Sequence, residues 1–197
     1  MSDYPFPNAI YTESRELFER YAAFDGDTDK IKTGDCGYHA LQIDLARWQV
    51  RNFGGCDARE MALGICEEIC CEWVTALTIG SEPELLDAVG DALIFLAQLL
   101  TLNRISIGPL LKYASTHPVW VIGDPVVQAG KLAHIVLKRA QKIRTQRSDE
   151  EYRELLSTQA HAIVRSFGMD ARRAFVETAK TVLARDWVKN PATGDVP

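Results

Sequence analysis

The sequence lacks the features that mark secreted and membrane proteins. Its 197 residues contain no run of about 18 apolar residues, and the N-terminus MSDYPFPNAIYTE has neither a basic flank nor an apolar signal core. The five cysteines are an odd number, and three of them, Cys66, Cys70 and Cys71, crowd one stretch, which argues against a disulfide framework. We therefore expect a cytoplasmic protein that does not associate with a membrane. Cys66 and Cys70 lie one turn apart on an apolar helix face, and we expect them to be buried thiols.

The alternation of apolar and polar residues that is typical of half-buried strands is also missing. Apolar residues instead recur at three- and four-residue spacing, in segments separated by glycine, proline and polar stretches. This pattern predicts an all-α protein, a helical bundle or a pair of bundles. The expected helices cover residues 11–24, 38–53, 62–77, 82–102, a shorter one within 103–115, and then 126–144, 148–167 and 170–187.

The helical segments repeat in order, which predicts a tandem organisation. The segments GICEEICCEWVTAL, ELLDAVGDALIFLAQLL and LNRISIGPLLKYA have counterparts in VVQAGKLAHIVLKRAQKIR, LLSTQAHAIVRSF and GMDARRAFVETAKTVLARDW. Where the first unit has acids, the second has Gln128, Lys131 and His161, so it cannot build the same cation site. We expect an arm, a helix and a polar loop over residues 1–37, an acidic unit over 38–115, a basic unit over 116–190 and a tail over 191–197.

Carboxylates occupy the polar strip of the most apolar helix pair. Glu68 and Glu72 lie one turn apart in the first helix, and Asp87 and Asp91 lie one turn apart in the second. Burying an uncompensated carboxylate costs several kcal/mol at least, and like charges one turn apart repel each other. A divalent metal ion bound between the two pairs is the simplest way to stabilise them.

The charges are distributed unevenly along the chain, although the net charge is only −5. Residues 57–91 hold nine acids and one base, Arg59, whereas residues 128–147 hold six bases and no acid. A metal held by the acids and phosphates held by the bases would satisfy both segments, although a solvated basic helix face explains the bases equally well. Nucleic-acid binding is not expected, because no aromatics interleave with the bases and the overall charge is negative.

The acidic helices resemble the MazG-like members of the all-α nucleoside triphosphate pyrophosphohydrolases. That family carries a glutamate pair and a third glutamate on one helix, and an acid and an aspartate on the next. Here GICEEICCE and DAVGDALIFL occupy those places after the helix LARWQVRNF, and LAHIVLKRAQKIR and VLARDWVKNP are similar to further segments of the family. The resemblance covers roughly residues 38–190.

The resemblance implies hydrolysis of a nucleoside triphosphate to the monophosphate and pyrophosphate. Glu68, Glu72, Asp87 and Asp91 would hold Mg²⁺, or Mn²⁺ in its place, because an oxygen-only donor set suits a hard cation. Glu67 or Glu68 would take the proton of the attacking water. The substrate would be bound by groups outside the acids: Lys138 and Arg144 would bind its phosphates, and Trp48 or His39 would contact its base, although Trp48 also fits a core position.

Two departures from the family pattern leave the ligand set open. Glu72 follows Glu68 by four residues where three are usual, and the residue three before Asp91 is Ala88, with Asp87 one residue earlier. Glu67 in place of Glu68, or Glu84 together with Asp87, are alternative ligands. The altered spacing also allows a catalytically silent protein that binds or sequesters nucleotides, and a third hypothesis is a purely structural helical module. The family further implies a homo-oligomer, unless the internal repeat pairs with itself.

Overall fold

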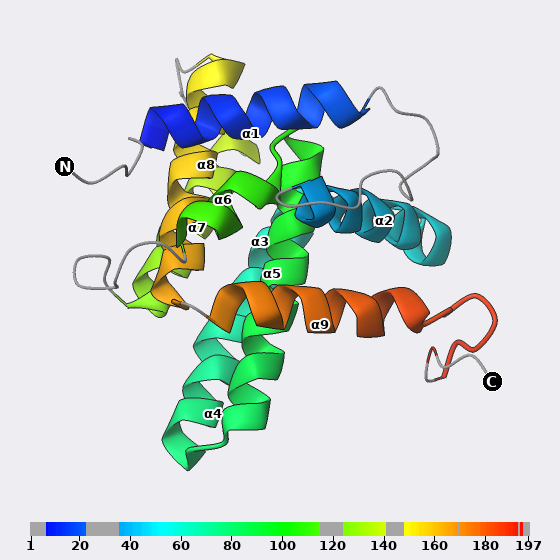
Figure 1. Ribbon diagram of the computed structural model, residues 1–197. Helices are drawn as coiled ribbons and strands as arrows, with labels where there is room; N and C mark the ends of the chain where they lie inside the picture. The colour runs from blue at the N-terminus through cyan, green and yellow to red at the C-terminus, as the bar shows by residue number, and fades with distance from the viewer. Residues whose placement is uncertain are drawn as a thin grey trace.

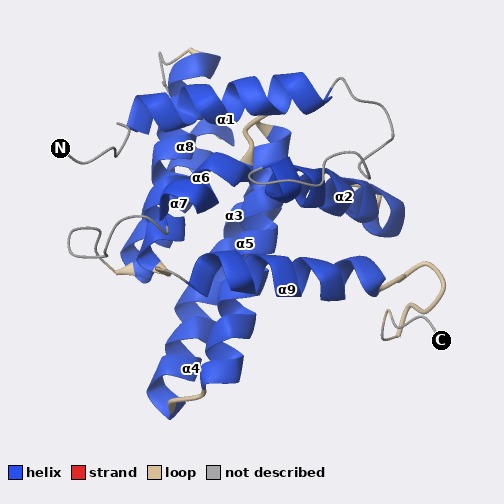
Figure 2. Cartoon of the chain, in the orientation of Figure 1, coloured by secondary structure: helices blue, strands red, loops and turns tan. Residues whose placement is uncertain are grey.

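The computed structural model contains only helices and their connections in the residues that it describes, which are 7–22, 36–114, 124–140, 148–168, 170–192 and 194 (Figures 1 and 2). The all-α prediction is confirmed. In chain order the elements are α1 (Pro7–Ala22), α2 (Cys36–Phe53), α3 (Ala58–Glu67), the π-helical segment η2 (Glu68–Trp73), α4 (Val74–Ile79), α5 (Glu82–Leu102), α6 (Ile107–Ala114), α7 (Pro125–Ala140), α8 (Asp149–Ser166) and α9 (Asp170–Ala184).

Local signals in the sequence explain most of the helix ends. Asp57 caps α3 and Ser148 caps α8, each in a reciprocal capping box with the glutamate three residues later. Gly80 ends α4 in the left-handed conformation, with φ of 70°, and Pro83 occupies the first turn of α5. The predicted break between the acidic helices is therefore confirmed.

The first helix begins earlier than expected. It starts at Pro7 rather than Tyr11, because proline is well suited to a first helical turn where no backbone N–H is needed. Ser14 lies inside the helix and donates its hydroxyl to the Ile10 carbonyl at 2.7 Å. The rest of the expected arm, residues 1–6, and most of the polar loop, residues 23–35, lie outside the described residues.

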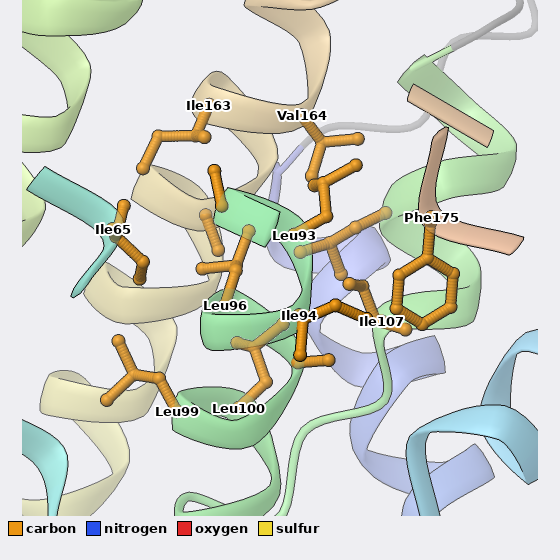
Figure 3. Packing of buried hydrophobic residues seen from close by; sticks show 14 of the residues in the cluster. Ile65, Leu93, Ile94, Leu96, Leu99, Leu100, Ile107, Ile163, Val164 and Phe175 are labelled. Carbon is orange, nitrogen blue, oxygen red and sulfur yellow. The ribbon is translucent and has the colours of Figure 1, made fainter. Parts of the chain in front are cut away.

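Helix α5 runs through the centre of the molecule, between α3 and η2 on one side and α9 on another (Figure 1). Its side chains form the middle of one continuous hydrophobic core that takes residues from both halves of the chain. Figure 3 shows this packing, with Leu93, Leu96, Leu99 and Leu100 of α5 among Ile65, Ile107, Ile163, Val164 and Phe175. The two expected units thus share a core, and their tandem relationship stays a prediction.

The central position of α5 also explains its composition. It is the one described helix that is long and apolar enough to cross a membrane by length and composition, although Asp87 and Asp91 interrupt its apolar residues. In the structure 61% of its most apolar stretch is buried against the other helices. A buried core helix passes the same test of length and composition.

The surface formed by α3, η2 and α4 is less buried than the sequence pattern suggested. Leu63 and Leu77 are 62% and 50% exposed, and Cys70 and Cys71 are exposed as well. Helix α7 covers only the side that carries Cys66, whose thiol lies 3.8 Å from the Ala129 carbonyl, and α4 projects beyond the bundle (Figure 1). The expectation of a buried thiol is therefore wrong for Cys70, and Cys66 is only partly buried.

Candidate functional site

The acid-bearing helix departs from α-helical geometry where the acids lie. Glu68 is the first residue of the π-helical segment η2 and is 9% exposed, whereas Glu67 and Glu72 are exposed. A π-helical turn holds one more residue than an α-helical turn, because its hydrogen bonds join residues five apart. Glu72 therefore takes the angular place that residue 71 would have in an α-helix, and it stays on the same side as Glu68.

The electrostatics of Glu68 and Asp91 indicate that each of these two carboxyl groups lies near other acids of the predicted set. Burial raises the pKa of Glu68 to about 8, and the charges of Glu72, Asp91 and Glu67 add to the increase. Burial likewise raises the pKa of Asp91 to about 6, followed by the charges of Asp87 and Glu72, while Arg185 acts in the opposite direction. Asp91 thus interacts with acids of both helices.

Glu68 is the most buried of these four carboxylates. Its Oε2 atom is buried and has no hydrogen-bond partner. Within the described part of the chain, no ion pair involves Glu68, Glu72, Asp87 or Asp91. A buried carboxylate oxygen without a partner is costly, so this position favours either protonation or a bound cation.

The donor atoms fit a hard cation by type but do not form a closed ligand shell. No group of three or more His, Cys, Asp and Glu side chains is arranged to hold a metal ion among the residues described. The four candidate ligands are all carboxylates, and Glu72 and Asp87 are exposed side chains on the helix surface. Their rotamers can change without disturbing the core, so the donor set is compatible with Mg²⁺ after side-chain adjustment.

A pocket of about 340 Å³ lies between α5 and α9 and reaches two of the acids. Asp87 and Asp91 line its α5 wall, and the opposite wall includes Glu177, Thr178, Thr181 and Arg185. The volume lies near the lower end of the range for ligand sites. The pocket therefore connects the acid cluster with solvent on the side of α9.

Arg185 is a candidate site residue to which the sequence assigned no role. Its backbone carbonyl accepts a hydrogen bond at 2.8 Å from the indole N–H of Trp48. Trp48 is buried and its ring meets Phe53 edge-on at 5.4 Å, so the core interpretation of this tryptophan is confirmed. Its burial leaves little ring surface for a nucleotide base. The only sequence signal for Arg185 was the similarity of VLARDWVKNP to the family.

The structure does not bring Lys138 to the acids. Helix α7 runs antiparallel to the acid-bearing helix, since Ala129 contacts Cys66 and Asp124 lies near Cys70. Lys138, nine residues beyond Ala129, is therefore displaced by about 14 Å along α7, away from Glu68. Its neighbour Arg139 pairs with Asp149 of α8, and Arg144 lies outside the described residues.

Comparison with known proteins does not identify a family for this chain. No family model matches the sequence, no curated protein matches it, and no solved structure matches the fold. The functional argument therefore depends on the geometry of the acid cluster and on the resemblance of its motifs.

Proposed function

We propose that the protein is a Mg²⁺-dependent nucleoside triphosphate pyrophosphohydrolase that cleaves between the α- and β-phosphates and yields the monophosphate and pyrophosphate. Mn²⁺ is the alternative ion. One observation carries the proposal: the buried Oε2 of Glu68 has no partner and lies within a cluster of carboxylates that forms no ion pair with a described residue. A hard divalent cation is the ligand that best stabilises such a cluster.

Each acid has a role in this proposal. Glu68, Glu72, Asp87 and Asp91 would hold the ion, which supplies positive charge to offset the charge that develops on the leaving pyrophosphate. Glu67, exposed and next to Glu68, accepts the proton of the attacking water. The pocket between α5 and α9 admits the substrate to Asp87 and Asp91.

The π-helical segment supports the resemblance to the MazG-like family. The family spacing places the third glutamate three residues after the second, whereas Glu72 follows Glu68 by four. A helix that contains one additional residue in a widened turn keeps both acids on one face. The altered spacing is therefore what a one-residue insertion absorbed by a π turn would produce.

A catalytically silent nucleotide-binding protein is the second candidate. The open arrangement of the four acids, which form no ready-made group of three metal ligands among the described residues, favours it. Such a protein would bind a nucleotide at the same pocket without turnover. Self-association, which the family resemblance implies, stays a prediction that sedimentation velocity can test.

The test measures pyrophosphate release and nucleotide binding separately. The purified protein is incubated with Mg²⁺ and a panel of canonical and modified nucleoside triphosphates, beside the variants Glu68→Gln and Asp91→Asn. Glu16→Gln, an exposed acid on α1, is the matched control. We expect release that falls at least about a hundredfold in the two site variants only. Mg²⁺-dependent binding without release would favour the silent protein, and neither binding nor release would overturn both candidates.

A further inference from the structure

Three arginines on α9 or directly after it differ in whether their guanidinium groups have a hydrogen-bond or ion-pair partner among the described residues. Arg172 donates to the carbonyls of Leu111 and Lys112 at 2.9 and 2.8 Å, and Arg173 lies 3.9 Å from Glu82. Arg185 lines the pocket near Asp91, yet its guanidinium has no hydrogen bond or ion pair with any described residue. A guanidinium in this position is available for an anionic ligand.

The backbone around Arg185 is held firmly although its side chain is exposed. Its N–H donates to the Val182 carbonyl at 3.1 Å, and its carbonyl accepts from Trp48 Nε1 at 2.8 Å. Two residues later, the Trp187 N–H donates to Asn52 Oδ1 at 2.7 Å. Trp48 and Asn52 are themselves one turn apart on α2, joined by a 2.9 Å bond from Asn52 Nδ2 to the Trp48 carbonyl. The side chains of Trp48 and Asn52 therefore hold the backbone of residues 185–187, which directly follow α9, against α2.

The pocket combines charges that no simple ion satisfies. Three acids, Asp87, Asp91 and Glu177, line the pocket together with one arginine, Arg185. A bare anion would be repelled by the acids, and a bare cation would leave the guanidinium of Arg185 without an anionic partner. A phosphoanhydride that carries its own divalent cation presents positive charge to the aspartates and phosphate oxygens to the arginine. Arginine suits that role because its planar fork bonds phosphate oxygens in pairs.

We propose that Arg185 binds the phosphate oxygens of a metal-bound phosphoanhydride in the pocket between α5 and α9, and that Trp48 and Asn52 are positioning residues that hold Arg185 in place. The identity of the ligand rests on the proposed function, whereas the anion-binding role of Arg185 does not require turnover. Arg185 is thus the cationic partner that lies near the acids, where Lys138 does not.

The first experiment measures binding by isothermal titration calorimetry, with Mg²⁺ alone, Mg²⁺-pyrophosphate and an α,β-methylene nucleoside triphosphate with Mg²⁺ as three probes. Arg185→Ala should weaken the two phosphate probes roughly ten- to a hundredfold, with Arg185→Lys in between. Binding of Mg²⁺ alone should be unchanged or tighter, because a positive charge near Asp91 has been removed. Unchanged binding of the phosphate probes would overturn the proposal, and so would an equal loss of binding for all three probes, since Arg185 would then not act on phosphate specifically.

Arg173→Ala is the matched control, because Arg173 lies on the helix that leads to Arg185, about 18 Å away along its axis, and should leave all three affinities unchanged. The positioning role is tested by Trp48→Phe, which keeps a ring but removes the donor, and by the pair Asn52→Leu and Asn52→Asp. We expect weaker phosphate binding in Trp48→Phe and Asn52→Leu, and recovery in Asn52→Asp, which retains the oxygen acceptor. Equal effects of Asn52→Leu and Asn52→Asp would overturn the positioning role.

Failure of this inference can be distinguished from failure of the proposed function. If pyrophosphate is released and Arg185→Ala leaves KM and probe binding unchanged, the function stands and the role of Arg185 falls. If no triphosphate is hydrolysed but binding of Mg²⁺-pyrophosphate depends on Arg185, the inference stands and the hydrolase proposal falls.

Discussion

Gly90 of α5 packs directly against Thr178 of α9, at a distance that leaves no room for a side chain. A Cβ atom at Gly90 would overlap Thr178 Oγ1 and would lie 2.8 Å from Thr178 Cβ. Gly90 directly precedes Asp91, and Thr178 lines the same pocket. The close approach of these two helices therefore sets the width of the pocket beside the acid.

The substitution Gly90→Ala should destabilise the protein by about 1–3 kcal/mol, because the added methyl group forces α9 away from α5. Urea denaturation followed by circular dichroism measures the change. Combining it with Thr178→Ala should recover part of the loss, since the overlapping oxygen is then gone. Gly130→Ala is the control: a methyl group there would meet no atom of a described neighbour within 4 Å, so it should stabilise α7 by about 0.5–1 kcal/mol. A neutral Gly90→Ala would contradict the packing.

The acid cluster should make the metal-free protein less stable as pH rises. The folded-state pKa is raised to about 8 for Glu68 and to about 6 for Asp91, so the folded state holds these protons at pH values where the unfolded chain has lost them. This contribution to stability is complete below their ordinary pKa values of 4.5 and 3.8, and it is lost as pH rises through the raised values. Urea midpoints measured in EDTA between about pH 4 and 8 should fall with pH, and less steeply in Glu68→Gln. Parallel curves for the two proteins would contradict the burial of Glu68.

Added Mg²⁺ should raise the melting temperature, and the increase should be larger at about pH 8 than at about pH 5.5, because the ion competes with protons for the carboxylates. Differential scanning fluorimetry with and without EDTA measures it. Asp91→Asn should abolish the increase, since Asp91 interacts with acids on both helices. Glu16→Gln on α1 should behave like the wild type. An equal increase in Asp91→Asn would place the ion elsewhere.

Deletion of Cys71 should be tolerated. It removes one residue from the widened turn η2, so the segment can become a regular α-helix in which Glu68 and the next acid remain on one face. We expect a folded protein that still binds Mg²⁺, as shown by circular dichroism and calorimetry. Deletion of Leu63, in the regular helix α3, is the control and should disrupt folding, because it rotates Ile65 and Ile69 out of the core. An unfolded Cys71 deletion together with a folded Leu63 deletion would refute the insertion hypothesis.

Local chemistry made much of the helical framework predictable. The glycine at position 80, the proline at 83 and the serine at 148 act within one turn of the chain, so their effects on α4, α5 and α8 can be read from the sequence. The start of α1 was missed because an arm with proline residues reads as irregular chain as easily as a first helical turn.

The site was only partly predictable, because spacing within a helix can be read from the sequence but the relative direction of separate helices cannot. Periodicity predicted that Glu68 and Glu72 share one side of their helix, as Asp87 and Asp91 share one side of the next. The effect of Glu72 and Asp91 on the pKa of Glu68 agrees with this prediction. Lys138 was assigned to the substrate phosphates from the family resemblance and from the basic charge of its segment. Charge carries no direction, and α7 places that lysine well along its axis from Glu68.

The sequence by itself determined the all-helical framework, the acids on the inner pair of helices and the turn that joins them, since all of these depend on spacing within short segments. Only the tertiary structure decided which basic side chain, that of Arg185, lies near those acids. Trp48 and Asn52 are more than 130 residues from Arg185 and Trp187 along the chain, and hydrogen bonds between such distant positions leave no periodic trace in a sequence. The widened turn at Glu68 was decided in the same way, because backbone hydrogen bonding there depends on how the helix packs against α5.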